Sequence, residues 1–425
     1  WERIVDENDV QSYALCIIED PENANLLFLG TDDGLYISIN AGEKWTKWTE
    51  SFPTVPVKDL VIHPRENDLI IGTFGRAAWV LDDIRPLRAI ANGNVLSKKL
   101  QVFTPPTAYD AASQQPTGSR FGADAMYQGE NRKTGAIISY YINIPQIDKK
   151  EEKSADENVE NSDENSDKTE NTVKNDSIKL EIFDGERLIR TLKFKTPKES
   201  GIHKTTWYLR EKGVDRASRS SRESKNEPRG VAVKPGTYHL KMTLGDAISE
   251  QDIKVAFDPR LQISEEAINQ KYNASKELEG YQEKMAAIVK QLVESKNTAE
   301  AIKNQLTKDN KTKYKEELKS SKEIIKKIDN LIDVFLGKID KRQGITRNKE
   351  VTVNERFGTA SWYVSSRFGA QTATETQLVN QFKEAFTKAV TNTNSFFNSD
   401  WLTYKSSVEK IQISQFKETK IYPTN

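Results

Sequence analysis

Hydrophobic residues follow three different patterns along the chain. In the N-terminal part they form short runs, such as residues 26–29 and 69–71, which Gly, Pro, Asn and Asp separate. Residues 178–183 then alternate between apolar and polar, as a half-buried strand does. From residue 268 onward, apolar side chains recur at steps of about three to four residues, which is the spacing of a helix face. The pattern predicts a multidomain chain that is mainly β at first and then α.

The N-terminal runs repeat one another. Three apolar segments recur in the same order after about 42–45 residues, which is the spacing of β-propeller blades. The first copy comprises residues 15–18, 25–31 and 34–38, and the second comprises residues 60–63, 67–73 and 78–81. We therefore predict that residues 1–90 form the last two blades of a propeller. Because a propeller has roughly four to eight blades, we expect the remaining blades to lie outside this chain.

A turn motif lies in the first copy. Residues 38–45 read Ser-Ile-Asn-Ala-Gly-Glu-Lys-Trp and nearly match the Asp-box, S-x-D-x-G-x-x-W, of BNR-type propeller repeats. Asn40 stands where Asp is usual, and its side-chain oxygen can still accept hydrogen bonds from backbone N–H groups of the turn. Gly42 permits a positive φ, and Trp45 is expected to cover the hairpin. The motif predicts a structural role for Ser38, Asn40, Gly42 and Trp45.

The middle of the chain is predicted to be a second β domain. Residues 91–260 should form a linker followed by an Ig-like β-sandwich, with a hairpin turn at Asp184-Gly185. Residues 148–177 are almost entirely Asp, Glu, Lys, Asn and Ser, so we expect a disordered acidic insert between two strands. The expected strands are residues 136–142, 178–185, 188–192, 203–209, 234–240 and 253–257.

Residues 261–425 are predicted to form an antiparallel helical bundle, with a turn near residues 309–310 and a loop over 341–370. The loop carries aromatic and arginine side chains, which are typical of protein interfaces. A plug that covers the end of the bundle is the alternative. The candidate interface residues are Arg356, Phe357, Trp362, Tyr363, Arg367 and Phe368. Residues 216–222, which are rich in Arg and Ser, are expected to be a solvated loop, with contact to an anionic partner as the alternative.

The order of these parts resembles the C-terminal portion of sortilin-type, BNR-repeat proteins of Gram-negative bacteria, which are often labelled glycosyl hydrolases. The resemblance is strongest over residues 25–88, where residues 72–84 look like a closing blade. It implies export, with a place in the periplasm, at the outer membrane or on the cell surface. Sortilin relatives bind ligands with the propeller, whereas some Asp-box propellers are sialidases or xyloglucanases.

Composition narrows the classes of function. The chain has 425 residues, and its 63 basic side chains balance its 63 acidic ones, so no bulk charge favours nucleic acid. No apolar run has the length of a membrane span. The single cysteine, Cys16, excludes a disulfide framework and a cysteine metal site. We expect no cofactor and no metal, and a protein partner or a surface glycan, within a larger complex.

Four carboxylates are the weak candidates for catalysis: Asp32, Asp33, Asp82 and Asp83. Endo-glucanase propellers use two carboxylates across a cleft, but each adjacent pair here would point to opposite faces of an extended chain and lies at an expected turn. The sequence therefore favours a non-catalytic exported protein that binds a ligand or partner. The alternative is a propeller glycoside hydrolase whose catalytic residues lie mostly on other blades, and a peptidase-like or sialidase-like hydrolase is a third hypothesis.

Overall fold

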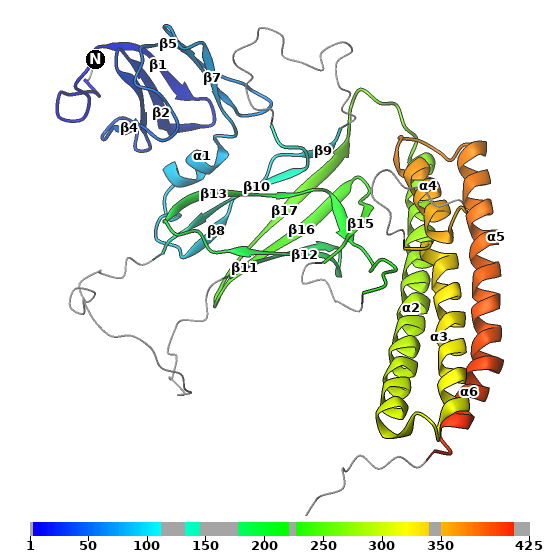
Figure 1. Ribbon diagram of the computed structural model, residues 1–425. Coiled ribbons are helices and arrows are strands. Elements are labelled where there is room, and N and C mark those ends of the chain that lie inside the picture. Colours follow the sequence, from blue (N-terminus) through cyan, green and yellow to red (C-terminus); the bar gives the residue numbers. More distant parts are fainter. Residues whose placement is uncertain (1–2, 112–131, 145–176, 221–226, 340–349, 412–425) are drawn as a thin grey trace, which may run out of the picture. The chain divides into compact units, whose positions relative to one another are not determined.

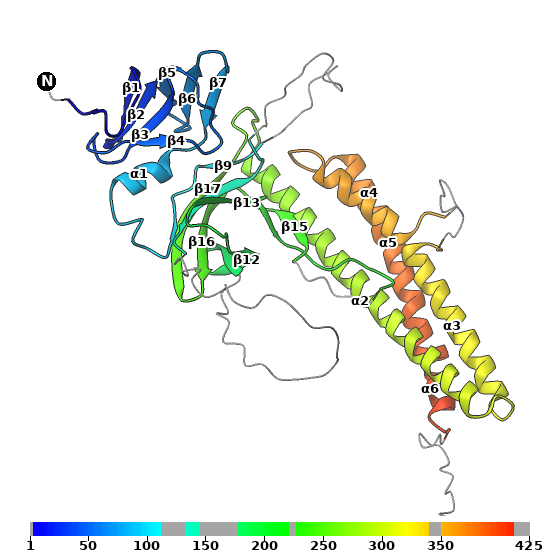
Figure 2. The ribbon, with the colours of Figure 1, turned by 60° about the vertical axis from the view of Figure 1, so that its left-hand side comes forward.

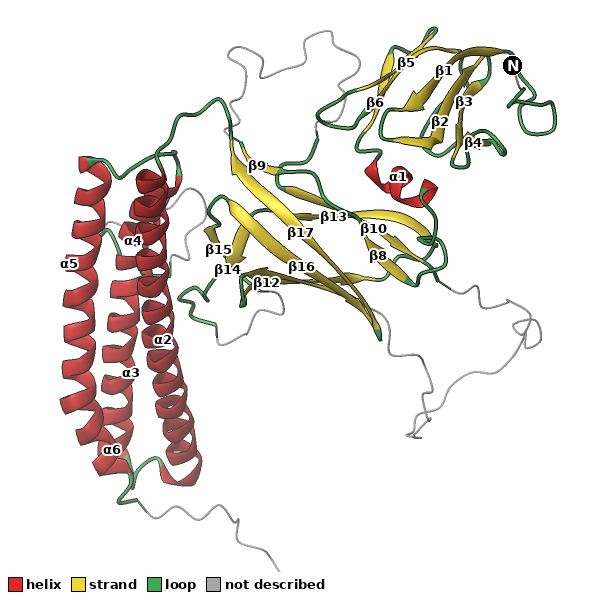
Figure 3. Ribbon diagram, turned by 180° about the vertical axis from the view of Figure 1, so that it is seen from behind, coloured by secondary structure: helices red, strands yellow, loops and turns green. Residues whose placement is uncertain are grey.

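The computed structural model describes residues 3–111, 132–144, 177–220, 227–339 and 350–411. The chain divides into two compact units (Figure 1). Unit 1 comprises Trp1–Arg210 with Pro235–Leu261, and unit 2 comprises Glu211–Lys234 with Gln262–Asn425. Strands dominate the first unit and helices dominate the second (Figure 3), as the sequence pattern predicts.

Two antiparallel sheets begin unit 1. The first follows chain order, with β1 (Ala14–Asp20), β2 (Asn23–Thr31), β3 (Gly34–Ser38) and β4 (Thr46–Trp48) as successive neighbours. The second has the same order but three strands, β5 (Val57–Ile62), β6 (Leu69–Thr73) and β7 (Ala78–Leu81). The strands expected from the two repeat copies are all present.

The two sheets bury one face against each other. Because successive side chains of a strand point to opposite faces, Leu26 and Phe28 of β2 share one core with Leu69 and Ile71 of β6. The other face of the first sheet is buried too, in a cluster of Val10, Leu27, Leu29, Tyr36 and Trp45. On the second sheet the other face stays open, since Val61 is 48% and Val80 57% exposed.

A short helix, α1 (Arg85–Ala91), follows the second sheet. Its first turn contains Pro86, whose fixed φ suits the start of a helix and whose missing N–H needs no partner there. The sequence pattern did not predict this helix. Ala89 and Ile90 pack against Val95, Phe103 and Tyr141, which joins α1 to the β domain of the same unit.

The rest of unit 1 contains two further sheets. One has the order β13-β10-β8 and the other β12-β11-β16-β17-β9, in which only β17 and β9 are parallel. Trp207 of the first and Tyr238 of the second meet edge to face, with ring centroids 5.4 Å apart. The strands are β8 (Leu100–Val102), β9 (Ala108–Asp110), β10 (Ala136–Ile142), β11 (Ser177–Asp184), β12 (Arg187–Lys195), β13 (Gly201–Trp207), β16 (Gly236–Leu244) and β17 (Ala247–Phe257).

The expected hairpin at Asp184-Gly185 is confirmed, because β11 and β12 pair there and Gly185 has a φ of 59°. The acidic insert expected at 148–177 lies outside the described residues, apart from Ser177, which is the first residue of β11. The structure adds β8 and β9, which the sequence pattern did not predict. A small sheet of β14 (Arg210–Lys212) and β15 (Arg229–Ala232) leads into unit 2.

Unit 2 is a bundle of helices that run side by side (Figure 2). They are α2 (Glu265–Asn310), α3 (Lys315–Leu336), α4 (Val353–Ser365), α5 (Ala373–Phe396), a π-helical turn η1 (Phe397–Trp401) and α6 (Leu402–Val408). The expected turn near residues 309–310 is confirmed: Asn310 Oδ1 accepts hydrogen bonds from the backbone N–H groups of Thr312 and Lys313.

The loop predicted over 341–370 is wrong for Val353–Ser365, which form α4. The cause is a capping box. Thr352 Oγ1 accepts from the Glu355 N–H while Glu355 Oε2 accepts from the Thr352 N–H, so the helix start is satisfied locally. Residues 341–349 of the expected loop lie outside the described residues.

Candidate functional site

The turn at residues 38–45 is held by its own side chains. Asn40 Oδ1 accepts a hydrogen bond from the Lys44 N–H at 3.0 Å, and Ser38 Oγ accepts one from the Gly42 N–H at 2.9 Å. Gly42 has a φ of 91°. The buried Trp45 donates its Nε1–H to the carbonyl oxygen of Ile4 at 2.7 Å. Asn40 and Ser38 thus bind backbone N–H groups of the turn, and Trp45 packs in a buried cluster with Val10, Leu27, Leu29 and Tyr36.

Asp32 and Asp33 lie in the turn between β2 and β3. Asp32 is exposed, whereas Asp33 accepts hydrogen bonds from Lys47 Nζ and Thr31 Oγ1, each at 2.7 Å. Burial raises the pKa of the Asp33 carboxyl, but the hydrogen bonds from Lys47 and Thr31 outweigh this effect and lower its pKa overall. A general acid needs the opposite shift, so Asp33 is held as a carboxylate.

Asp82 and Asp83 follow β7, and both are paired with arginines. Arg132 Nη2 lies 3.3 Å from Asp82 and 2.7 Å from Asp68. Asp83 has a positive φ of 59° and accepts a hydrogen bond from Arg85 Nε. The chain direction therefore changes at Asp83, and its carboxylate stabilises the start of α1. The structure assigns both residues to connections between elements.

One buried ion pair was missed by the sequence analysis. Arg88 of α1 is 6% exposed and Asp20, at the end of β1, is 1% exposed. Arg88 Nε lies 2.8 Å from Asp20 Oδ1, and its Nη1 donates to Asn67 Oδ1 at 2.7 Å. A buried charge must be paired. No local signal could identify this contact, because Asp20 lies 68 residues from Arg88 in the sequence.

A hollow of about 410 Å³ adjoins this pair within unit 1. Its lining mixes amide, hydroxyl and apolar side chains, and its two arginines, Arg85 and Arg88, are already bound to Asp83 and Asp20. The lining holds one carboxylate, Glu22, which lies 2.9 Å from Arg88 Nη1. The remaining polar lining comes mainly from Asn23, Asn92, Gln101, Thr104 and Gln251. No pair of unpaired carboxylates faces this hollow among its lining residues.

The six candidate interface residues do not form one surface. Trp362 and Tyr363 are 63% and 39% exposed on α4, and their rings meet edge to face with centroids 4.9 Å apart. Phe357 instead turns inward, with its ring centroid 5.5 Å from that of Phe382. Arg356 is half-buried on the same helix. Of this set, Trp362 and Tyr363 present the most apolar surface to solvent.

Arg367 and Phe368 belong to the corner between α4 and α5. Arg367 Nε donates to the buried carboxylate of Glu375 at 3.0 Å, and Lys271 Nζ lies 4.9 Å from the centroid of the Phe368 ring. Glu375 also completes a capping box with Thr372, which begins α5. Glu375 was missed by the sequence analysis, although Thr-x-x-Glu is a local helix-start signal. The corner is fixed by hydrogen bonds and ion pairs.

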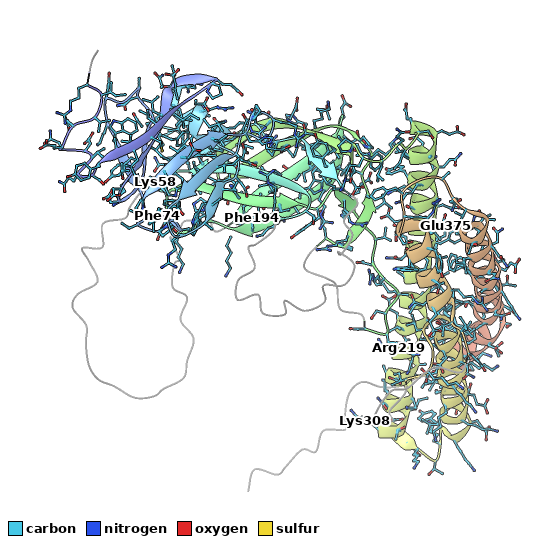
Figure 4. All side chains as sticks on the ribbon, turned by 90° about the horizontal axis from the view of Figure 1, so that it is seen from above. Lys58, Phe74, Phe194, Arg219, Lys308 and Glu375 are labelled. Atoms are coloured by element: carbon cyan, nitrogen blue, oxygen red, sulfur yellow. The ribbon has the colours of Figure 1, made fainter. Side chains whose placement is uncertain are left out.

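Within the described part of the Arg- and Ser-rich segment, residues 216–220, Ala217 and Arg219 contact the bundle, whereas the other three residues are exposed. Arg219 donates to Asp333 Oδ1 at 2.7 Å and also to the carbonyl oxygen of Gly337, at the C-terminal end of α3 (Arg219 and Glu375 are labelled in Figure 4). Cations are stabilised at the C-terminal end of a helix. The expectation of a solvated loop is therefore wrong for Arg219, since its guanidinium binds α3.

Comparisons with known proteins do not show a family for this chain. No family model matches the chain, and no curated protein matches it. A solved structure of the extracellular domain of a proposed one-component system from B. thetaiotaomicron matches with 10% identity and a TM-score of 0.14. The match covers 58% of this chain and 25% of that one. A TM-score of this size does not indicate a shared fold, so no property of that protein is carried over.

Among the residues that the structure describes, no helix is long and apolar enough to cross a membrane. No group of three or more His, Cys, Asp or Glu side chains among them is arranged to hold a metal ion.

Proposed function

We propose that this protein is a non-catalytic binding protein that acts in an exported assembly, and that its first two sheets are blades of a propeller. The repeat offset, the chain-order antiparallel sheets and the capped Asp-box turn support the blade assignment. The resemblance to sortilin-type proteins supports export and a ligand or protein partner. An Ig-like sandwich is the corresponding proposal for the sheets that contain β10 and β16.

One observation carries the non-catalytic part of the proposal. Three of the four candidate carboxylates are bound to cations: Asp33 to Lys47, Asp82 to Arg132 and Asp83 to Arg85. A glycoside hydrolase needs one carboxyl that is protonated at working pH and a second that faces it across the substrate. These three carboxylates are already bound by side chains of the fold, and each lies at a turn or a connection, so they suit structural roles better than acid catalysis.

The test uses the full-length protein and a matched variant in which Asp32, Asp33, Asp82 and Asp83 are all changed to Asn. Both proteins are incubated with xyloglucan and with sialyllactose, and released sugar is measured. We expect no release above background from either protein. Robust cleavage that the variant loses would overturn the proposal, and cleavage that the variant keeps would place a hydrolase site on other parts of the protein and overturn it as well.

A further inference from the structure

Two faces of the helical bundle differ sharply in charge. On α3, seven of the nine exposed residues are Lys or Glu. On α5, only two of the thirteen exposed residues, Glu384 and Lys388, are charged, and the others are mostly Thr, Asn, Gln and Ser. Both helices contribute to the same apolar core of the bundle. Folding of the bundle therefore does not require that their exposed faces differ in charge.

Helix α4, which packs against α5, is also low in charge. Residues 357–366 contain no charged side chain, and they include the exposed Trp362 and Tyr363. Interfaces are depleted in charge at their centres and enriched in Trp and Tyr, which often dominate binding energy. We call the exposed residues of α4 from Gly358 to Ser365, together with those of α5, the low-charge face.

The low-charge face rests on a rigid support. Beneath it, Phe382 and Phe386 of α5 pack edge to face on Tyr281 of α2, with centroid distances of 5.5 and 5.3 Å. At its end, the Arg367–Glu375 ion pair and the capping box of Thr372 fix the corner between α4 and α5. A surface that is already ordered loses less conformational entropy on association.

We propose that a second copy of this chain binds the low-charge face, so that the protein self-associates through α4 and α5. An amide or hydroxyl group both donates and accepts hydrogen bonds, and such a surface is therefore complementary to its own copy. The lysine-rich face of α3 is not complementary to its own copy, because a symmetric contact places like charges together. Trp362 and Tyr363 supply the apolar contact that hydrogen bonds alone do not.

The face is long enough for a stable contact. Helix α5 has 24 residues, which corresponds to about 36 Å at 1.5 Å per residue. Packing of this length together with α4 is expected to reach the roughly 1,000 Å² that a biological interface needs. The low-charge face lies in unit 2, so self-association through it does not depend on the function proposed for the β-rich unit.

Sedimentation velocity of the full chain over a concentration series, from about 1 to 200 µM, tests the proposal. Wild-type protein is expected to form dimers within this range. Asn380→Glu with Thr387→Glu places two negative charges on the exposed side of α5 and should weaken dimerisation at least about tenfold, as should Trp362→Ala. The control, Asn330→Glu with Val334→Glu, adds the same charges at exposed positions of α3 and should leave dimerisation unchanged.

Circular dichroism shows whether each variant keeps its helices, and a variant that does not is replaced by a single substitution at the same face, Gln381→Glu. A wild-type chain that stays monomeric at the highest concentration overturns the proposal. Equal weakening by the α3 control overturns it too, because the contact then responds to net charge or lies on another face.

Discussion

The first and second N-terminal sheets share one repeat but are completed in different ways. Both place alternate residues of their strands in a common core. The first sheet also buries its other face, beneath Trp45 and Val10. The second leaves Val61 and Val80 exposed there, and Phe74 is exposed at its β6–β7 turn (Figure 4). Its connections are held by arginines, since Arg88 binds Asp20 and Arg132 binds Asp68 and Asp82.

The difference arises after the third strand of each sheet. In the first sheet, Asn40 and Gly42 form a capped turn that returns the chain as β4. In the second, Asp83 takes a positive φ and directs the chain into α1 instead. The repeated apolar pattern therefore determines the shared core, whereas the connecting residues determine what covers the outer face and which interactions hold the sheet in place.

The largest effect is expected from Arg88→Ala, which tests whether ion pairs hold the second sheet. It leaves the carboxylate of Asp20 buried without its cation, which costs about 3–5 kcal/mol of unfolding free energy. Urea unfolding measures the loss. Arg65→Ala removes an exposed pair with Glu66 and is the control, with a change below about 1 kcal/mol. Equal losses in the two variants would contradict the role given to the buried pair.

Trp45→Ala tests the apolar cover of the first sheet. Trp45 is 4% exposed, so its truncation leaves a large cavity and should cost about 3 kcal/mol. Val80→Ala on β7 is the matched variant, because Val80 lies on the open face of the second sheet; it is 57% exposed, and we expect a loss below about 1 kcal/mol. Guanidinium unfolding gives both values. A loss for Val80→Ala as large as that for Trp45→Ala would mean that the outer faces of the two sheets are covered alike.

Much of the fold was predictable because its signals are local. The Gly-Thr pairs at 30–31 and 72–73 and the Asp184-Gly185 turn mark strand ends within a few residues, and the structure has strands there. Helix α4 also had a local signal, namely the Thr352-x-x-Glu355 capping box with apolar residues at 353, 357, 360 and 364. The aromatic and arginine side chains of this segment suggest an interface loop, but its capping box and helical period determine the structure, so the loop prediction is wrong.

The candidate sites were less predictable because their partners are distant in the sequence. Arg132 lies 64 residues from Asp68 and 50 from Asp82, and no periodic pattern links them. Composition likewise identified Trp362 and Arg367 as one group, but exposure separates them: the first faces solvent and the second binds Glu375. Residue types suggest chemistry, whereas burial and pairing decide which side chains remain available for it.

A smaller effect is expected at the turn that distinguishes the first sheet. Asn40→Ala removes the acceptor of the Lys44 N–H hydrogen bond and should cost about 1 kcal/mol. Asn40→Asp keeps a side-chain oxygen that can accept this bond, and should keep wild-type stability. Thermal unfolding followed by circular dichroism compares the two variants. An Asn40→Ala protein as stable as the Asp variant would show that Gly42 alone suffices to form the turn.

The smallest effect concerns the ion pair that links Asp33 to Lys47 of β4. Burial raises the pKa of the Asp33 carboxyl, but the hydrogen bonds from Lys47 and Thr31 lower it overall below its ordinary value, so the folded protein binds this proton less readily than the unfolded chain. Stability from this group is therefore present above about pH 4 and is lost as pH falls through the folded pKa. Since the pair is partly exposed, Lys47→Met should cost less than about 1 kcal/mol at neutral pH. Urea midpoints of wild type and variant should converge as pH is lowered below 4.

The matching change on the second sheet is Lys58→Met, at an exposed lysine of β5, and its midpoint difference from wild type should not vary over this range. A constant gap for Lys47→Met would instead mean that the lysine stabilises β4 through its contact with the ring of Tyr36 rather than through the carboxylate.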